Sequence, residues 1–308
     1  MNKRKKLICL ILLMLIAVTA LSVLLIHRAK INNEIKKAEE LKRAEELRQQ
    51  EEKARLAAER EEEERAIASH VYSHRGIEGP YEESFKAYDE VIDAGSQNIE
   101  MDLVLSSDGV LFLSHDLNAS HMTGVNASYS SMTAEEIDGL QTLEGDKVLR
   151  LSEVFDKYGK SINYNIELKT LDDDTIEAFE SIVDKYGFKD IITVQAVDTD
   201  VLRILDEKYP EMPKLFVCKS QQSFYESLEM PYVDNISVSF DRGLMTEENC
   251  SAAHDRGKQF SAWTLSLESS IRKAIDMNVD SYFTNDTPLA LSLEREYGLK
   301  ARTMDNKE

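Results

Sequence analysis

The stretch NIEMDLVLSSDGVLFLSHD, residues 98–116, holds the pattern that decides how this chain folds. Residues 98–105 form an apolar run, which favours a buried β-strand. Glu100 and Asp102 stand two residues apart in that run, so both carboxylates point to the same face of the strand. The sequence therefore predicts a pair of oxygen ligands for a hard cation.

A turn signal follows directly. The Asp-Gly dipeptide at 108–109 is typical of a two-residue hairpin loop, and the apolar run at 110–114 fits a returning antiparallel strand. In that register Asp102 faces His115, with Cβ atoms roughly 4.5–5.5 Å apart. We then expect Asp102 to raise the basicity of the His115 imidazole, unless a bound metal ion neutralises the charge of Asp102. The alternative is an ordinary hairpin whose polar residues face water.

Outward from this hairpin, β-rich apolar runs alternate with helical patterns, which is typical of parallel strands joined by crossover helices. Eight strands are predicted, at residues 70–73, 98–105, 161–168, 191–195, 214–217, 235–240, 259–264 and 280–284. Helical patterns lie between them and after the last. Eight repeats without a second domain predict an α/β fold, the (β/α)8 TIM barrel, within residues 70–308. A doubly wound parallel sheet is the alternative.

Catalytic groups of such barrels lie at the carboxyl ends of the strands. Polar side chains at the predicted strand ends should therefore surround one mouth: His74, Arg75, Glu100, Asp102, Glu167, Lys169, Gln195, Ser239, Trp263 and Asn285. Glu167 and Lys169 could form a plain strand-end ion pair. Three convergent carboxylates, however, would repel one another unless a metal ion or protons relieved them.

The N-terminus has a different composition. Residues 7–26 contain no charged side chain and are long enough to cross a hydrocarbon layer of about 30 Å, which predicts a transmembrane anchor. The cations at residues 3–6 keep the short N-terminus, residues 1–6, in the cytoplasm and place the rest of the chain outside. A cleaved signal peptide, with small residues at 18–20, is the alternative.

Residues 27–69 consist mainly of Ala, Glu, Lys, Arg, Leu and Gln, with neither Gly nor Pro. High helix propensity throughout predicts a charged helical stalk that holds the following domain away from the membrane. Glu45 and Glu52 interrupt the heptad seam, so a lone helix is favoured over a coiled coil. A partly disordered linker is the other interpretation.

Charge narrows the classes of partner. Residues 70–308 carry 22 Lys and Arg against 45 Asp and Glu, a net charge of −23, and can form one domain. Such a surface excludes nucleic acid as a partner and offers no obvious basic or apolar lip for a lipid surface. Cys218 and Cys250 predict no disulfide framework, which suits an exported bacterial protein.

Several motifs, in a fixed order, resemble the glycerophosphodiester phosphodiesterase family: His74-Arg75-Gly76, Ile99-Glu100-Met101-Asp102, Asp108-Gly109, His115-Asp116, Ile166-Glu167-Leu168-Lys169, Trp263-Thr264 and Thr284-Asn285. The resemblance covers about residues 70–295 and does not extend to the anchor or the stalk. Together with the apolar span at residues 7–26, it identifies the chain as a membrane-anchored bacterial member of the family. One motif departs from the family pattern. The family's Pro-Glu-Asn-Thr loop reads Tyr81-Glu82-Glu83-Ser84 here, which puts the shape of that loop in question.

The resemblance implies a TIM-barrel enzyme that uses one divalent cation, Ca²⁺ or Mg²⁺, to hydrolyse glycerophosphodiesters to glycerol 3-phosphate and an alcohol. By position it implies metal ligands at Glu100, Asp102 and Glu167, catalytic histidines at His74 and His115, and phosphate contacts at Arg75 and Lys169. Trp263 at the mouth predicts a wall for the glycerol group, with core filling as the alternative. Which histidine is the acid, and whether water or a substrate hydroxyl attacks, stays open.

Three rival functions share this fold. A phospholipase could act on intact membrane lipid, and a related hydrolase could act on a glycerophosphate wall polymer. A catalytically dead interaction module displayed at the cell surface would have lost an acid, base or metal ligand, and none of the implied residues is missing. The oligomeric state is not indicated by the sequence.

Overall fold

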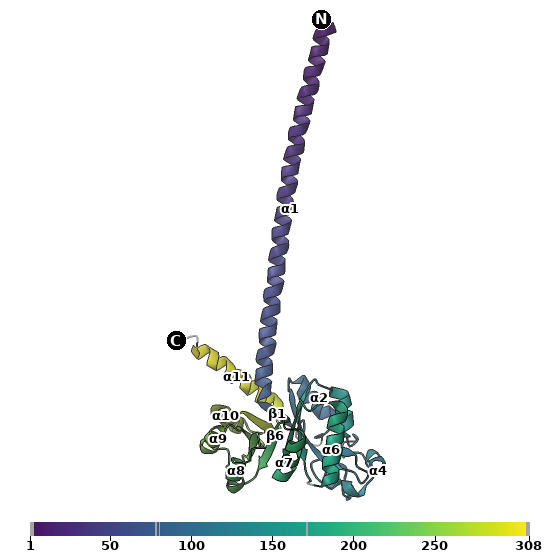
Figure 1. Ribbon diagram of the computed structural model, residues 1–308, viewed down its shortest axis with the longest axis vertical. Helices are drawn as coiled ribbons and strands as arrows, with labels where there is room; N and C mark the ends of the chain where they lie inside the picture. The colour runs from purple at the N-terminus through teal and green to yellow at the C-terminus, as the bar shows by residue number, and fades with distance from the viewer. Residues whose placement is uncertain (1–2, 78, 80, 171, 306–308) are drawn as a thin grey trace. The chain divides into compact units, whose positions relative to one another are not determined.

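The computed structural model describes residues 3–77, 79, 81–170 and 172–305 (Figure 1). It divides into two units, one ending at residue 62 and the other beginning at residue 63, and each is described by itself.

A single helix, α1, runs from Lys3 to Ser69. Within it, an 18-residue window reaches a mean hydropathy of 2.7, so by length and composition the helix could cross a membrane. A signal sequence near the N-terminus would have the same length and composition. The hydroxyls of Thr19 and Ser22 donate to carbonyls one turn earlier, at 3.0 and 2.8 Å, which suits an apolar surrounding. Farther along, exposed ion pairs such as Arg55 with Glu52 (2.8 Å) support the solvated part of the helix.

Eight parallel strands close into a barrel. They are β1 (Val71–His74), β2 (Asn98–Leu105), β4 (Asn163–Leu168), β5 (Ile192–Ala196), β6 (Lys214–Cys218), β7 (Asn235–Ser239), β8 (Gln259–Trp263) and β9 (Ser281–Thr284). β1 pairs with both β2 and β9, which closes the ring. The predicted TIM barrel is confirmed, and the doubly wound sheet is wrong.

Helices cover the outside of the barrel (Figure 1). They are α2 (Phe85–Asp93), α5 (Leu151–Tyr158), α6 (Asp173–Tyr186), α7 (Thr199–Lys208), α8 (Gln221–Ser227), α9 (Glu247–His254), α10 (Glu268–Asp276) and α11 (Thr287–Asp305). Several begin after a residue whose side chain accepts a hydrogen bond from the first turn: Ser84, Asp172, Asp198, Ser220 and Thr246. These caps explain why helices start where the strand-end loops finish.

Side chains alternate along the strands between two environments. In β2, Ile99, Met101 and Leu103 join the main apolar core with residues of the surrounding helices, and Ile166 does the same from β4. The intervening positions are polar and point into the barrel. This alternation directs the carboxylates of β2 and β4 to the mouth.

β3 (Leu111–Leu113) is a short ninth strand, antiparallel to β2. The pairing of β1 with β2 ends where His74 faces Glu100, and β3 pairs with the next part of β2, from Leu103 onward. Because β3 runs back along β2, it returns the chain to the mouth at Ser114.

The predicted register of this hairpin was wrong by one residue. Leu103 pairs with Leu113, so Asp102 lies opposite Ser114, whose N–H donates to the Asp102 carbonyl at 3.0 Å. A three-residue turn at 107–109 replaces the predicted two-residue turn, with Gly109 at φ +83°. His115 therefore reaches the mouth from beyond the end of β3 rather than by facing Asp102 across the ladder.

An insertion between β3 and α5 forms a small lobe beside the barrel. It contains α3 (Ser120–Thr123), the 3₁₀ turn η1 (Tyr129–Ser131) and α4 (Ala134–Asp138). Its own core contains eight residues: Val104, Phe112, Ala119, Tyr129, Met132, Ala134, Ile137 and Val148. The lobe fixes the segment that carries His115, because Phe112 of β3 belongs to this core.

Gly76 provides a test of how α2 packs against the mouth. Its φ is +86°, and a Cβ at this position would lie 2.8 Å from the Cβ of Ala87. We expect Gly76→Ala to lower the free energy of unfolding by about 2–4 kcal/mol, from backbone strain and overpacking together. Gly145 is the matched control, with φ +89° and open space around it, and Gly145→Ala should cost only about 1 kcal/mol. Equal losses in denaturant titrations would contradict the packing argument.

Candidate active site

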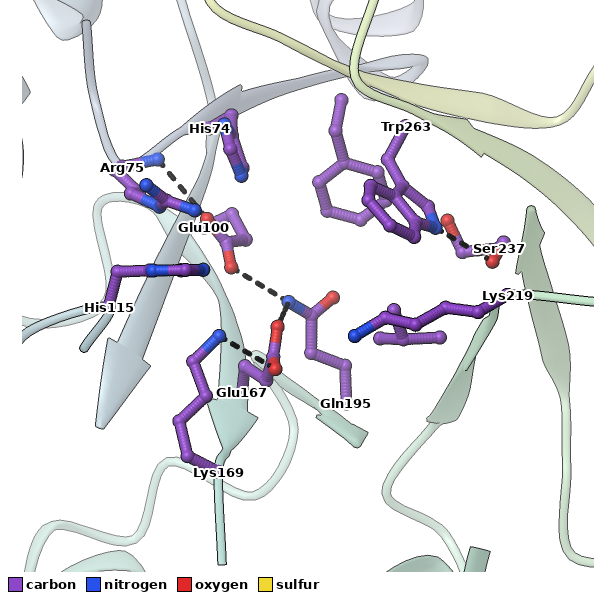
Figure 2. Close-up of a pocket in the computed structure, with 12 residues that line it drawn as sticks. His74, Arg75, Glu100, His115, Glu167, Lys169, Gln195, Lys219, Ser237 and Trp263 are labelled. Carbon is purple, nitrogen blue, oxygen red and sulfur yellow. Dashed lines mark hydrogen bonds and ion pairs between the residues drawn. The ribbon is translucent and has the colours of Figure 1, made fainter. Parts of the chain in front are cut away.

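One pocket at the carboxyl ends of the strands collects seven of the eight predicted site residues: His74, Arg75, Glu100, His115, Glu167, Lys169 and Trp263 (Figure 2). The eighth, Asp102, is 1% exposed and lies against Arg75 and Lys169. The pocket encloses about 440 Å³ and is partly open to solvent. Gln195 also lines it, as the strand-end rule predicted.

Three carboxylates converge on one side of the pocket. Glu100 and Asp102 come from β2 and Glu167 from β4, and one oxygen of each lies within 4.8 Å of the others. Asp102 and Glu167 are direct partners in the parallel ladder, which explains their proximity. Burial, reinforced by the charge of Asp102, raises the pKa of both glutamates. Burial opposes ionisation of Asp102 as well, but Lys169 and Arg75 outweigh it and lower its pKa.

Two cations hold these carboxylates. Nε of Arg75 lies 2.9 Å from Oδ2 of Asp102. Nζ of Lys169 lies 2.7 Å from Oδ1 of Asp102 and 2.7 Å from Oε1 of Glu167. The amide of Gln195 donates to Oε1 of Glu100 at 2.7 Å. Positive charge is thus concentrated on Asp102, and Glu100 is held mainly by neutral donors.

His74 ends β1 and turns its ring into the pocket (Figure 2). Its Nδ1–H donates to Oδ1 of Asn285 at 2.7 Å, which leaves Nε2 to face the pocket. Burial and the charge of Arg75 lower the pKa of His74 to about 4. The ring is therefore neutral near pH 7, with a free lone pair on Nε2.

His115 stands across the mouth and is 41% exposed at its side chain. Its Nδ1–H donates to Oδ1 of Asp116 at 2.8 Å. The prediction that Asp102 faces this imidazole across the ladder was wrong, because Asp102 lies opposite Ser114 and forms ion pairs with Arg75 and Lys169. Asp116 takes that role and orients Nε2 of His115.

Glu83 is a buried part of this site that the sequence did not reveal. It is fully buried at φ +56°, and its Oε1 accepts the N–H of Asp102 at 2.8 Å. The hydroxyl of Tyr88, on α2, donates to its other oxygen. Burial and the charge of Asp102 raise the pKa of Glu83 to about 8. Two features of the sequence could have indicated this role: Glu83 stands where the family's loop has asparagine, and Tyr88 follows five residues later.

The far side of the pocket contains two further polar residues that were not predicted. Lys219 follows β6 by one residue, and Ser237 lies on β7 with its side chain buried. Nε1 of Trp263 donates to the carbonyl of Ser237 at 3.1 Å, which fixes the indole as a wall of the pocket. Lys169 lies one residue beyond its predicted strand and was found. Lys219 was missed because the strand predicted at 214–217 ends one residue before β6 does, which puts Lys219 two residues beyond it.

The glycerophosphoryl diester phosphodiesterase family model matches residues 74–289, most of the barrel. This chain belongs to that family. It is therefore an enzyme of the phosphodiesterase class, and the resemblance read from its motifs is confirmed.

Relatives agree with this assignment. A glycerophosphodiester phosphodiesterase of Caldanaerobacter subterraneus subsp. tengcongensis is 24% identical over 242 residues, which is 74% of this chain and 98% of that protein. A lysophospholipase D of Homo sapiens is 21% identical over 267 residues, covering 72% and 84% of the two chains. Both alignments account for most of each relative.

Solved structures share the fold. A phosphodiesterase of Oleispira antarctica, determined in complex with the product sn-glycerol-3-phosphate, superposes with a TM-score of 0.66 at 20% identity and covers 74% of this chain and 96% of that one. A glycerophosphodiester phosphodiesterase of Thermotoga maritima gives a TM-score of 0.62 at 24% identity, covering 73% and 97%.

The residues at the mouth fit a divalent cation. In the described part of the chain, the three convergent carboxylates of Glu100, Asp102 and Glu167 meet two cations in direct ion pairs, Arg75 and Lys169. All the candidate ligands are carboxylate oxygens, the donors that hard cations such as Ca²⁺ and Mg²⁺ prefer. Excess negative charge and an all-oxygen donor set both favour such an ion.

Tyr88→Phe tests the buried support beneath Asp102. The change removes one hydroxyl and leaves an oxygen of Glu83 without its donor, so the free energy of unfolding should fall by about 1–3 kcal/mol. Tyr186→Phe is the control, because Tyr186 donates to the exposed Asp156 at 2.8 Å. Its loss should stay below about 1 kcal/mol. A Tyr88→Phe protein as stable as the parent in urea would show that Glu83 does not need this bond.

Proposed function

We propose that this chain hydrolyses glycerophosphodiesters to glycerol 3-phosphate and an alcohol at the barrel mouth. The observation that carries the proposal is one pocket in which two imidazoles, of His74 and His115, face a cluster of three carboxylates. Family membership supports the reaction class. The product bound in the Oleispira antarctica enzyme supports glycerol 3-phosphate as the product here.

Glu100, Asp102 and Glu167 would hold one divalent cation, Ca²⁺ or Mg²⁺. When bound, it supplies Lewis-acid stabilisation of the negative charge on the phosphoryl oxygens. Arg75 and Lys169 would add charge-assisted hydrogen bonds to the same phosphate. Trp263 lines the pocket, and its indole would form a wall for the glycerol group.

The two histidines divide the proton transfers. Nε2 of His74 takes the proton of the nucleophile, a water molecule or a substrate hydroxyl, as its oxygen bonds to phosphorus. The bond from phosphorus to the alcohol oxygen breaks, and that oxygen takes a proton from Nε2 of His115. Attack by water gives glycerol 3-phosphate directly. Attack by the glycerol hydroxyl gives a cyclic glycerol phosphate, which water then opens to glycerol 3-phosphate with His115 as the base and His74 as the acid. His74 suits the base because burial keeps it neutral, and His115 suits the acid because it stands across the mouth with its Nδ1–H held by Asp116.

Metal dependence is the first expected property. The full chain should release glycerol 3-phosphate from glycerophosphodiesters of small alcohols, and a chelator should abolish turnover reversibly, because unscreened carboxylates would repel the phosphate. Product release measured enzymatically, before and after metal is restored, checks this. Undiminished turnover in metal-free buffer would contradict the proposed cation site.

Replacement of either histidine should separate catalysis from folding. His74→Ala and His115→Ala should each lower kcat by at least about 10²-fold, the usual contribution of a general acid or base. Asp116→Asn should lower it less, because His115 stays in place without its orienting carboxylate. His121→Ala is the control, since that side chain is 66% exposed and lies outside the pocket. Near-normal kcat in either of the first two variants contradicts the assignment.

A lipid substrate is the second candidate, and one observation favours it. Exposed apolar side chains follow strands at the mouth: Leu117 after β3, Val197 after β5 and Leu267 after β8, at 50, 41 and 68% exposure. The sequence offered no obvious apolar lip, and these three side chains are the exposed apolar groups from which one could form. The human relative is named a lysophospholipase D. Faster turnover of lysophospholipids than of the deacylated diesters would favour this function.

We further propose that residues 7–26 anchor the chain in the cell membrane, that residues 27–69 act as a stalk, and that the catalytic unit faces outward. Support comes from the cations before an apolar helix of sufficient length. Protease added to intact cells or protoplasts should digest the catalytic unit, with a cytoplasmic protein as the protected control. Protection until the cells are lysed would reverse the orientation.

A further inference from the structure

Asp102 lies in β2 where the ladder on one side of the strand is interrupted. The parallel pairing of β1 with β2 ends at Glu100, and the pairing of β3 with β2 begins at Leu103. The backbone of Asp102 therefore needs partners from outside these two ladders. Its carbonyl accepts the N–H of Ser114 at 3.0 Å, and its N–H donates to Oε1 of Glu83 at 2.8 Å. The carboxylate of Glu83 thus takes the place of a neighbouring strand.

Glu83 reaches Asp102 from a strained backbone conformation. Its φ is +56°, a value that residues with a Cβ rarely adopt, and its side chain is fully buried. The N–H of Glu83 donates to the carbonyl of Arg75 at 3.0 Å, and Arg75 also has a φ of +56°. Strain of this kind persists where surrounding contacts hold the chain, and it is concentrated at functional sites. Glycine or asparagine would adopt the conformation at lower cost, so the longer carboxylate side chain needs a reason.

The two oxygens of Glu83 supply that reason. Oε1 accepts the N–H of Asp102, and Oε2 accepts the hydroxyl of Tyr88 from α2. The three residues are each at most 1% exposed, so solvent does not compete for either hydrogen bond. One carboxylate therefore joins the helix beside the mouth to the backbone of a residue in the carboxylate cluster.

The position of Asp102 also decides where the charges of the mouth lie. Its two oxygens contact Arg75 at 2.9 Å and Lys169 at 2.7 Å. The parallel ladder sets Asp102 opposite Glu167, and oxygens of both residues and of Glu100 lie within 4.8 Å of one another. A shift of this backbone would move the ion pairs and the carboxylate cluster together.

We propose that Glu83 is a positioning residue, which fixes the backbone of Asp102 and thereby raises the affinity of the carboxylate cluster for a divalent cation. Tyr88 holds Glu83 in place for this role. Hydrogen-bond partners behind a metal-binding side chain typically contribute about 10–100-fold to metal affinity. The inference rests on the proposed function for the presence of the cation. Its readouts are cation affinity and the protection of one backbone N–H, without turnover.

Calorimetric titration of the metal-free full chain with Ca²⁺ and with Mg²⁺ tests the proposal. Glu83→Met removes both acceptor oxygens and should weaken binding of the preferred cation at least about tenfold. Glu83→Gln keeps an oxygen for the N–H of Asp102 and should retain most of the affinity. Asn249→Leu is the matched control, because Asn249 is 2% exposed and its Nδ2 donates to the carbonyl of Leu244 at 2.8 Å, outside the pocket. It should lower the stability and leave the affinity unchanged.

Amide hydrogen exchange gives a readout that needs no cation. In the metal-free chain, Glu83→Met should speed exchange of the Asp102 N–H at least about tenfold relative to that of Leu103, because its hydrogen bond is lost. Tyr88→Phe should change both readouts in the same direction, and it provides the test if Glu83→Met does not fold. Combined with Glu83→Met it should add little, since both changes act through one contact.

Parental cation affinity in Glu83→Met, or an equally large loss of affinity in Asn249→Leu, would overturn the positioning role. Unchanged protection of the Asp102 N–H in Glu83→Met would overturn it as well. If the parent chain binds neither cation, the proposed cation site fails, and exchange alone then decides whether Glu83 fixes the backbone of Asp102.

Discussion

The crowding of Glu100, Asp102 and Glu167 is the constraint on which the rest of the mouth depends. Their oxygens lie within 4.8 Å of one another in a buried setting, where like charges repel strongly. Arg75 and Lys169 oppose that repulsion, and both contact Asp102. A site of this kind attracts a cation and, through it, an anionic substrate. The same charges that would destabilise an ordinary core are thus arranged for chemistry.

Strand pairing places these charges before any side chain is considered. The parallel ladder sets Asp102 opposite Glu167, and the shared register of β1 and β2 sets His74 beside Glu100. β2 extends past the end of β1, and β3 returns along it to bring His115 to the same mouth. Asn285 and Asp116 then fix the two imidazole rings from different loops. The backbone positions the groups, and single hydrogen bonds orient them.

Periodicity predicted much of this arrangement. The alternation of apolar and polar residues in 98–105 is a local property, so Glu100 and Asp102 could be assigned to one face from sequence. The hairpin register could not, because an Asp-Gly pair fits both a two-residue and a three-residue turn, and Gly109 alone does not choose between them. The wrong register placed Asp102 opposite His115. In the structure, Asp116 accepts the hydrogen bond from the His115 imidazole.

Roles that depend on tertiary packing could also not be predicted from local sequence patterns. Glu83 contacts Asp102 because α2 packs tightly on the loop after β1, which no local pattern encodes. Tyr88 completes that contact from the helix. Lys219 lies two residues beyond the predicted strand at 214–217 and one residue beyond β6 itself, which ends at Cys218.

The proposed hydrolysis at the barrel mouth depends most on whether the carboxylates of Glu100, Asp102 and Glu167 bind a divalent cation. Calorimetric titration of the metal-free full chain with Ca²⁺ and with Mg²⁺ tests this directly. We predict one ion bound per chain for at least one of the two metals, with binding abolished in Glu100→Gln and retained in Glu294→Gln, whose carboxylate lies outside the pocket. Absence of binding, or binding that survives Glu100→Gln unchanged, would contradict the central claim.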